Sequence, residues 1–291
     1  MPGQLTEKAI AAQPAWLREV SERVGERRLL DGARVLFTGC GTSFHAALAC
    51  GPAAPALDVV LGHAPDADVL VAVSHEGGTR LTLEAIEAFA GETWLITGTL
   101  ESALARAVNH IVVATPEVEK SYCHTASYTC AIAAGRALQG EDVSGLADAV
   151  ERELAAEALA VSQHERYLVV GAGRDLPTAL EAVLKLREGA HVAAEAHHTE
   201  QLLHGHLAAI DGSVRCFVLE GERRAAERAQ DVIGALRELG CEATLVPTSH
   251  PVVDIVRFQR LTVDLAEARG VDPDLIRWDE DPWDRARKSY A

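Results

Sequence analysis

The sequence predicts an α/β protein built from two similar units, each a parallel sheet of about five strands flanked by helices in a flavodoxin-like three-layer sandwich. One motif occurs twice: VLFTGCGTSFHAAL begins at Val35, and YLVVGAGRDLPTAL begins at Tyr167. Each copy is an apolar run that opens into Gly-x-Gly and then a helix-like segment. Gly39 and Gly171 lie 132 residues apart. Segments typical of strands and helices alternate along the rest of the chain, which favours parallel sheets with helices on both faces.

The composition is that of a globular protein with aliphatic cores. Of the 291 residues, 48% are hydrophobic but only 4% are aromatic, and the length suits two domains. The formal net charge is −16, so a nucleic-acid partner is not expected, because an acidic surface repels phosphodiester backbones. A small anionic ligand is still compatible with this charge, since a local ring of backbone N–H groups can outweigh a diffuse field.

The first unit is predicted over residues 25–150, after a helical lead-in at residues 1–24 that Pro14 breaks. Apolar runs rich in β-branched residues predict its strands, and amphipathic runs after them predict its helices. The predicted strands are 33–39, 56–62, 68–74, 93–98 and 110–115, and the predicted helices begin at residue 42 or cover 81–90 and 121–139.

The second unit is predicted over residues 151–270, after a linker at 141–159 that is itself helical in pattern. Gly270 ends its last helix, since glycine is favoured just past a helix. The remaining tail, 271–291, is polar and interrupted by proline, and we expect it to wrap over the body and the active site. The predicted strands are 166–172, 214–221 and 243–248, and the predicted helices are 177–190, 224–240 and 251–270.

The first candidate binding loop is GCGTS at 39–43, which follows the first strand of the repeat. Its glycines, including Gly41, let the backbone approach a ligand closely, and Cys40 lies between them. Thr42 and Ser43 stand at the start of a helix, where hydroxyl and N–H groups bind oxyanions or sugar hydroxyls. The same residues would also serve as an ordinary helix cap. The loop lacks the third glycine of the dinucleotide-binding fingerprint, so no such cofactor is predicted.

The second candidate loop is SHEGGT at 74–79, after a run typical of a buried strand. Ser74 and Thr79 bracket two glycines, the first of them Gly77, and this shape suits a phosphate or a polyol. A polar strand-to-helix loop with Thr79 as its cap would have the same composition. Two glycines at the matching position of the fold favour the binding loop.

The third candidate segment, 184–211, concentrates carboxylates and imidazoles. Lys185 and Glu188 share a helix face at i,i+3 spacing, which a solvated salt bridge would also produce. A carboxylate and an imidazole together suit proton transfer, the carboxylate at carbon and the imidazole at a hydroxyl. Five histidines crowd the segment, but their spacing matches no standard zinc pattern, so no metal site is predicted. They are His191, His197, His198, His204 and His206.

The cysteines and the chain's hydropathy bear on the cellular compartment. The six cysteines form no Cys-x-x-Cys pair, and the first 30 residues lack the apolar core of a signal peptide. No stretch approaches the length needed to span a bilayer. We therefore expect a cytoplasmic protein with reduced thiols and no membrane partner.

Taken together, three motifs carry a family resemblance. GCGTS, the pattern Ser-x-x-Gly-x-Thr, and LKLRE…AEA…HG resemble the tandem SIS (sugar isomerase) domains in the isomerase half of glutamine–fructose-6-phosphate amidotransferase. The lead-in EKAIAAQP is similar to the segment before the family's first SIS domain, and the likeness keeps its order over nearly the whole chain. The resemblance implies two SIS domains without the glutaminase domain, and neither a redox cofactor nor a metal.

The resemblance also implies a role for each candidate residue. Glu188 would be the base that moves a proton between carbons 1 and 2 of an open-chain sugar, with Lys185 supporting it. His204 would open the sugar ring from the neighbouring subunit, which implies a homodimer with a shared active site. The sugar-phosphate pocket would be lined by Cys40, Gly41, Thr42, Ser43, Ser74, His75, Glu76, Gly77, Thr79 and Glu117.

Four positions depart from the family's pattern. Glu76 replaces the second serine of Ser-x-Ser-Gly-x-Thr, where a desolvated carboxylate would repel a phosphate. Glu76 therefore turns away, or the ligand has no phosphate at that end, or the ligand carries an amine. The family's C-terminal catalytic lysine corresponds to Lys288 when counted from the chain end, whereas the match through PDLIR puts Asp281 there. His206 replaces the proline of HGP, and His124 stands where a lysine is common.

The expected activity is aldose–ketose isomerisation of a sugar phosphate or amino-sugar phosphate, or its deamination, through an enediol or enolamine. Three alternatives stay open: a deglycase that cleaves a fructosamine-type adduct, a sugar-sensing protein without turnover, and a scaffold whose site has decayed. Glu76 favours the deglycase or the decayed site, and the acidic charge disfavours a DNA-binding regulator.

Overall fold

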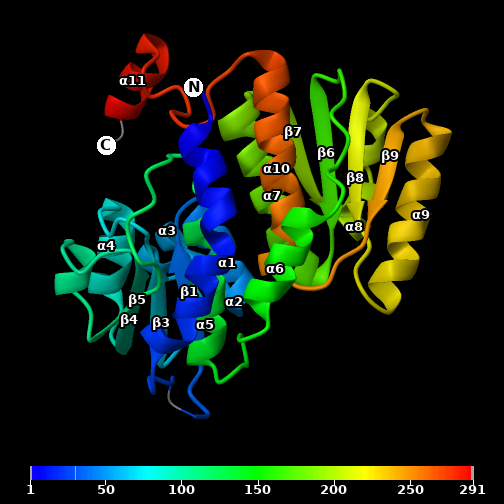
Figure 1. Ribbon diagram of the computed structural model, residues 1–291. Coiled ribbons are helices and arrows are strands. Elements are labelled where there is room, and N and C mark those ends of the chain that lie inside the picture. Colours follow the sequence, from blue (N-terminus) through cyan, green and yellow to red (C-terminus); the bar gives the residue numbers. More distant parts are fainter. Residues whose placement is uncertain (1, 30, 290–291) are drawn as a thin grey trace.

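The computed structural model describes residues 2–29 and 31–289 and contains two parallel sheets that lie side by side (Figure 1). The first sheet has five strands in the order β2-β1-β3-β4-β5, and the second has four in the order β7-β6-β8-β9. All their strand pairs are parallel. The carboxyl ends of all strands in such a sheet meet at one edge, and ligands bind there.

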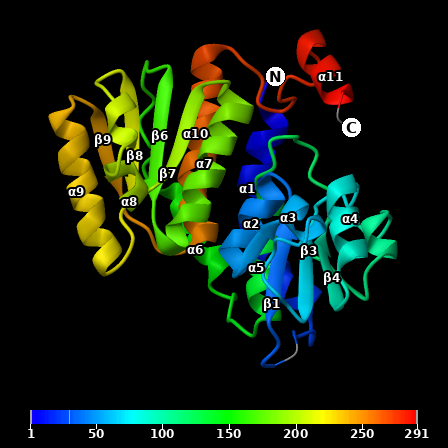
Figure 2. The same ribbon diagram turned by 180° about the vertical axis from the view of Figure 1, so that it is seen from behind.

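The first sheet is covered by helices on both faces, as the sequence predicts. Its central strand β3 is buried at every residue, which is typical of a parallel strand with helices above and below. Helix α2 packs on α5, and α3 packs on α4 (Figure 2). The strands are β1 Val35–Gly39, β2 Ala53–Pro55, β3 Val69–Val73, β4 Glu92–Thr97 and β5 His110–Val113, and the helices are α2 Thr42–Cys50, α3 Ala56–Val60, α4 Arg80–Ala88 and α5 Ala126–Leu138.

The second sheet has four strands, so the prediction of about five strands in each unit was wrong here. After β9 the chain enters α10 at Pro251 and returns to pack on α7, which leaves no segment for a fifth strand. The edge strand β7 was not predicted. The strands are β6 Arg166–Gly171, β7 Ala193–His198, β8 Val214–Leu219 and β9 Glu242–Val246, and the helices are α7 Leu176–Ala190, α8 Thr199–Leu203, α9 Arg224–Glu238 and α10 Pro251–Arg269.

Contacts between helices connect the two sheets. Helix α1, Gln4–Val24, packs against α5, against α10 and against α6, Leu146–Ala155. Helix α10 packs on α7, and α2 contacts α7 across the junction. The contact between α2 and α7 matters most for function, because each helix carries candidate site residues.

Helix α1 is continuous through Pro14, so the predicted break was wrong. A proline inside a helix leaves the carbonyl four residues earlier without its usual N–H donor. In this helix that carbonyl belongs to Ile10, and the Gln13 side chain donates to it from Nε2 at 3.1 Å. A neighbouring side chain thus satisfies the freed carbonyl.

Two further predictions of local structure were wrong. The predicted strand at 56–62 is the helix α3, because a short apolar run does not distinguish the two by periodicity. The predicted helix at 121–139 begins only at Ala126. The Glu119 carboxylate accepts hydrogen bonds from the N–H groups of Thr125 and Ser127, and this cap fixes the helix start.

Candidate functional site

Nine of the predicted site residues meet at the carboxyl ends of β1 and β3. They line an open pocket of about 440 Å³, here called the outer pocket, which is a common size for a small-molecule site. The nine are Cys40, Gly41, Thr42, Ser43, Ser74, His75, Glu76, Thr79 and Glu188. Since Glu188 comes from α7, the outer pocket lies where the second unit meets the first sheet.

Backbone geometry explains the glycines of both loops. Gly41 and Gly77 have φ angles of 56° and 65°, which residues other than glycine rarely adopt. A Cβ on Gly39 would lie 2.8 Å from the Ser43 carbonyl carbon, and a Cβ on Gly77 would overlap Ser102 Oγ. Gly77 itself shapes the turn while its neighbour Gly78 lines the outer pocket. The loops thus present hydroxyl groups and backbone around one space.

An ion pair on α7 lies at the outer pocket, with the partly exposed Glu188 lining it and the buried Lys185 behind. Lys185 Nζ lies 2.7 Å from Glu188 Oε2, and it donates a hydrogen bond to Thr42 Oγ1 at 3.2 Å. Burial raises the pKa of Glu188 above its usual range, although Lys185 offsets part of this rise. Burial alone would lower the pKa of Lys185, but the carboxylates of Glu188 and Glu181 outweigh it and raise that pKa. Lys185 is therefore charged, while Glu188 is a stronger base than an exposed carboxylate.

Behind this pair lies a carboxylate that the sequence analysis missed. Glu181 is fully buried, and its carboxylate accepts a hydrogen bond from Thr42 Oγ1 at 3.1 Å. Glu181 Oε2 lies 2.8 Å from His45 Nδ1. Glu181 Oε1, which Thr42 contacts, also lies 3.4 Å from Lys185 Nζ. The signal was present in the sequence, because Glu181, Lys185 and Glu188 follow i, i+4, i+7 spacing on one helix face. The pairing with His45 depends on the contact between α2 and α7.

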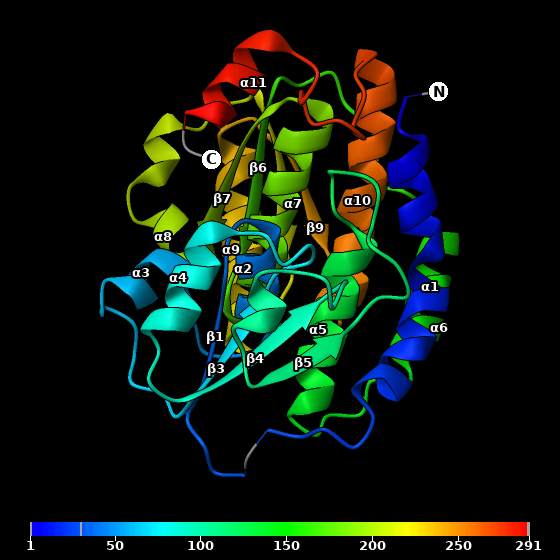
Figure 3. The same ribbon diagram turned by 90° about the vertical axis from the view of Figure 1, so that its left-hand side faces the viewer.

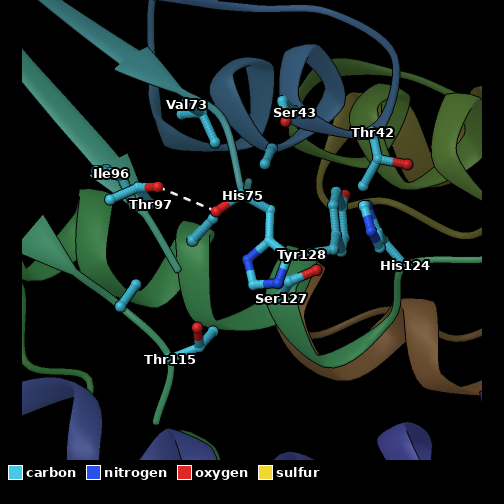
Figure 4. Close-up of a pocket in the computed structure, with 13 residues that line it drawn as sticks. Thr42, Ser43, Val73, His75, Ile96, Thr97, Thr115, His124, Ser127 and Tyr128 are labelled. Carbon is cyan, nitrogen blue, oxygen red and sulfur yellow. Dashed lines mark hydrogen bonds between the residues drawn. The ribbon is translucent and has the colours of Figure 1, made fainter. Parts of the chain in front are cut away.

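His75 connects the loop at 74–79 to the segment before α5. Its Nε2 accepts a hydrogen bond from the Glu119 N–H at 2.7 Å. Its ring meets the His124 ring edge-on, with 5.3 Å between centroids, and Figure 4 shows both rings near Tyr128. Burial lowers the pKa of each histidine to about 4, so both imidazoles are neutral at pH 7.

The C-terminal tail covers part of the outer pocket, and its short helix α11, Asp281–Lys288, lies beyond (Figure 3). Ile276 and Trp278 line the outer pocket, and Trp278 stacks on Tyr122 with 4.8 Å between ring centroids. Ile276 has a φ angle of 42°, which is rare for a β-branched residue. The sequence analysis named neither aromatic residue as a site residue.

Five predicted site residues do not line the outer pocket within this chain. Gly77 shapes its loop and Lys185 lies behind Glu188, and the other three lie away from the pocket. His204 is exposed and lies 2.9 Å from Glu200 through its Nε2. Lys288 is exposed on α11 and pairs with Asp284 at 2.7 Å, so the structure does not bring it to the pocket. Glu117 is exposed and lines a separate small pocket beside α1. These positions depend on contacts that the sequence does not reveal.

The described residues, 2–29 and 31–289, bear on metal binding and on membrane insertion. In this part of the chain no group of three or more His, Cys, Asp or Glu side chains has a geometry that could hold a metal ion. No helix there is long and apolar enough to cross a membrane. Of the crowded histidines of the third segment, His197 and His206 lie together, with 4.2 Å between ring centroids.

Comparison with known proteins finds similarity to a family model and to whole relatives. The family model for the SIS domain matches residues 160–273, which hold the second sheet and α10. Over 307 residues, the chain is 28% identical to the isomerizing glutamine–fructose-6-phosphate aminotransferase of Methanothermobacter thermautotrophicus. That match covers 88% of this chain and 51% of the relative, so the chain spans about half the relative's length.

Solved structures share the fold. The C-terminal domain of the Francisella tularensis glucosamine-fructose-6-phosphate aminotransferase superimposes with a TM-score of 0.79 at 19% identity, over 93% of this chain and 98% of that one. The glucosamine-6-phosphate deaminase of Thermotoga maritima superimposes with a TM-score of 0.75 at 22% identity, over 94% and 97% of the two chains. Both likenesses extend over nearly the whole of each chain.

Proposed function

We propose that this chain, which carries a SIS domain and is homologous to the isomerase domain of glutamine–fructose-6-phosphate aminotransferase, is an aldose–ketose isomerase or deaminase of sugar phosphates or amino-sugar phosphates. The observation that carries the proposal is Glu188, which lines the outer pocket and is paired with the buried Lys185 behind it. The names of the relatives, an isomerizing aminotransferase and a glucosamine-6-phosphate deaminase, supply the two reactions.

In this mechanism Glu188 moves one proton. Its carboxylate removes the proton from carbon 2 of an open-chain aldose and returns it to carbon 1, through an enediol or, with an amino sugar, an enolamine. A base needs a pKa near the working pH, and burial raises the pKa of Glu188 in that direction. Lys185 holds the carboxylate in place at 2.7 Å. This proton transfer needs neither a metal nor a redox cofactor.

The hydroxyl loops hold the rest of the sugar. Thr42 and Ser43 open helix α2, where N–H groups favour an anion, and Ser74 and Thr79 face each other at 3.5 Å across the second loop. Lys185 also donates a hydrogen bond to Thr42, which fixes the position of Glu188 relative to the loop at 39–43. These contacts support binding and proton transfer in one pocket.

We further propose that the protein is a cytoplasmic homodimer with a shared active site. His204 is 70% exposed, so its imidazole is accessible to the outer pocket of a second subunit, where it would open the sugar ring. Lys288 is 74% exposed and would act only if the tail rearranged. The proposed boundaries are a lead-in at 1–24, SIS domains at 25–150 and 151–270, and a tail at 271–291.

The base assignment is tested with Glu188→Gln. We expect turnover of glucosamine 6-phosphate and fructose 6-phosphate to fall by at least about 100-fold, because a carboxamide cannot accept the carbon-bound proton. Sugar-phosphate affinity, measured by isothermal titration calorimetry, should change by less than about threefold. The matched control is Glu87→Gln, an exposed position on α4. An equal loss of affinity and turnover would reject Glu188 as the base.

One observation favours a deglycase as the second candidate. Glu76 lines the outer pocket, and among the described residues no lysine or arginine lines it. A carboxylate at this position suits the amine of a fructosamine-type adduct better than it suits a phosphate. A thermal-shift panel of sugars with and without a phosphate, and with and without an amine, separates the candidates. If only phosphosugars stabilise the protein, the deglycase function is excluded.

A further inference from the structure

A second space lies behind the outer pocket, between the first sheet and α5. This space, here called the inner cavity, has about 20 Å³ open to the centre of a water-sized sphere. A buried water needs roughly 10–15 Å³ on that measure, so the inner cavity has room for one small molecule. Thr42, Ser43, His75 and His124 line both spaces, and they therefore form the boundary between the two (Figure 4).

Three buried polar atoms of the inner cavity have no hydrogen-bond partner among the described residues. They are Thr115 Oγ1, Tyr128 Oη and His124 Nε2. Thr115 and Tyr128 are each only 1% exposed, so bulk solvent does not reach them. Buried polar groups are nearly always hydrogen-bonded in proteins. Three such atoms around one cavity therefore indicate a ligand that supplies the missing bonds.

The inner cavity is electrically neutral. Among the described residues no aspartate, glutamate, lysine or arginine lines it. Its two histidines are uncharged at pH 7, because burial lowers the pKa of each to about 4. An ion in the inner cavity would lose its hydration shell with no opposite charge nearby, which is highly unfavourable in free energy. The inner cavity thus suits a neutral molecule that both donates and accepts hydrogen bonds.

We propose that the inner cavity binds one small neutral hydrogen-bonding molecule, water or ammonia, for the reaction in the outer pocket. The proposal rests on the proposed function in its deaminase direction. There the O–H of water adds across the C=N bond of the imine formed from an amino sugar. The C–N bond then breaks, a carbonyl forms, and ammonia leaves with the proton. The reverse reaction consumes ammonia and releases water, so either molecule has a role.

The site is tested by a high-resolution crystal structure and by Tyr128→Phe. We expect density for one molecule within hydrogen-bond distance of Tyr128 Oη and Thr115 Oγ1. We expect Tyr128→Phe to lower the thermal midpoint by about 2–4 °C, because a bond to the bound molecule is lost. The matched control is Tyr167→Phe, since the Tyr167 hydroxyl donates to the Ser162 carbonyl at 3.2 Å within the protein. An empty cavity overturns the proposal, and so does a raised midpoint for Tyr128→Phe, since removing an unpaired hydroxyl stabilises a protein.

Kinetics separate the two molecules. With fructose 6-phosphate and ammonium chloride in the aminating direction, an ammonia site predicts that Tyr128→Phe raises KM for ammonium about tenfold while KM for the sugar stays unchanged. An unchanged KM for ammonium would identify the bound molecule as water. In both cases Tyr167→Phe should keep the wild-type KM values. If no sugar is turned over at all, the proposed function fails, whereas the crystal structure and thermal midpoint still decide the cavity.

Discussion

At the scale of single residues, two carboxylates line the outer pocket in different surroundings. Glu188 is largely buried, and Lys185 holds it at 2.7 Å. Glu76 is exposed on the loop after β3, and the structure gives it no hydrogen-bond or ion-pair partner in the described part of the chain. A paired, buried carboxylate is suited to a fixed role in proton transfer, while an unpaired one at the rim is suited to contact a ligand.

The charge of Glu76 should decide which ligands bind. We expect Glu76→Ser to increase the affinity for sugar phosphates by about tenfold, because it removes a like charge near the anion and adds a hydroxyl donor. Calorimetric titration with fructose 6-phosphate measures this, and Glu76→Gln separates the loss of charge from the gain of a hydroxyl. Unchanged or weaker phosphosugar binding by both variants would mean that Glu76 does not face the phosphate.

At the scale of elements, one carboxylate joins the start of α1 to the tail over the outer pocket. Asp274 Oδ1 accepts hydrogen bonds from the Thr6 N–H at 2.8 Å and the Thr6 hydroxyl at 2.7 Å, and Oδ2 accepts from the Leu5 N–H at 3.0 Å. The Asp274 carbonyl accepts from the Tyr122 N–H. Residues far apart in sequence thus cap α1 and hold Tyr122 and Trp278 beside the pocket.

Loss of this cap should loosen the tail. We expect Asp274→Ala to lower the free energy of unfolding by about 2 kcal/mol, since two N–H groups of α1 and a buried hydroxyl lose their acceptor. Limited proteolysis should then cut within 275–289 faster than in the parent protein. Asp279→Ala, an exposed position in the same tail, is the control. Equal stability and equal cleavage rates for the two variants would contradict this role.

At the scale of the whole molecule, buried titratable groups determine how stability depends on pH. Burial lowers the pKa of His75, His124 and His250 to about 4, whereas an unfolded histidine titrates near 6.5. Between these values the unfolded chain binds more protons, so the three groups destabilise the fold as the pH falls from about 6.5 to 4. Asp254 acts in the opposite direction, because burial raises its pKa to about 6 and the folded chain binds its proton first.

Burial also raises the pKa values of Glu188, Asp175 and Asp264, which act in the same direction as Asp254. Because each of the three histidines has a large shift, we expect the histidines to outweigh these acids and the protein to become less stable in mild acid. We expect the free energy of unfolding to fall by on the order of 3 kcal/mol between pH 7 and pH 4.5, measured by urea denaturation. His250 Nδ1 accepts from the Val252 N–H at the start of α10, and asparagine keeps such a cap without the titration. His250→Asn should therefore reduce the fall by about 1 kcal/mol or more. If His250→Asn left the dependence of the unfolding free energy on pH unchanged, His250 would not contribute to it.

The sequence alone determined the α/β class, most of the strands and the helices that follow them. Apolar runs such as Val69–Val73 predict buried parallel strands, because only residues covered on both faces are apolar throughout. The resemblance to the SIS family assigned the loops after the strands at 33–39 and 68–74 to one pocket, and they lie together at the carboxyl ends of β1 and β3. The spacing of Lys185 and Glu188 predicts one helix face. All of these are local or periodic signals, which a single sequence contains.

The tertiary structure decided what depends on contacts between distant segments. Glu181 and His45 pair only because α2 packs on α7, and Tyr122 stacks on Trp278 only because the tail crosses the outer pocket. Pro14 does not break α1, because Gln13 satisfies the freed carbonyl. The inner cavity exists because side chains from β3, β4, α2, α5 and the loops beside them leave a space that none of them fills. Pairing between distant side chains is a property of the packed chain, and no periodic pattern in the sequence displays it.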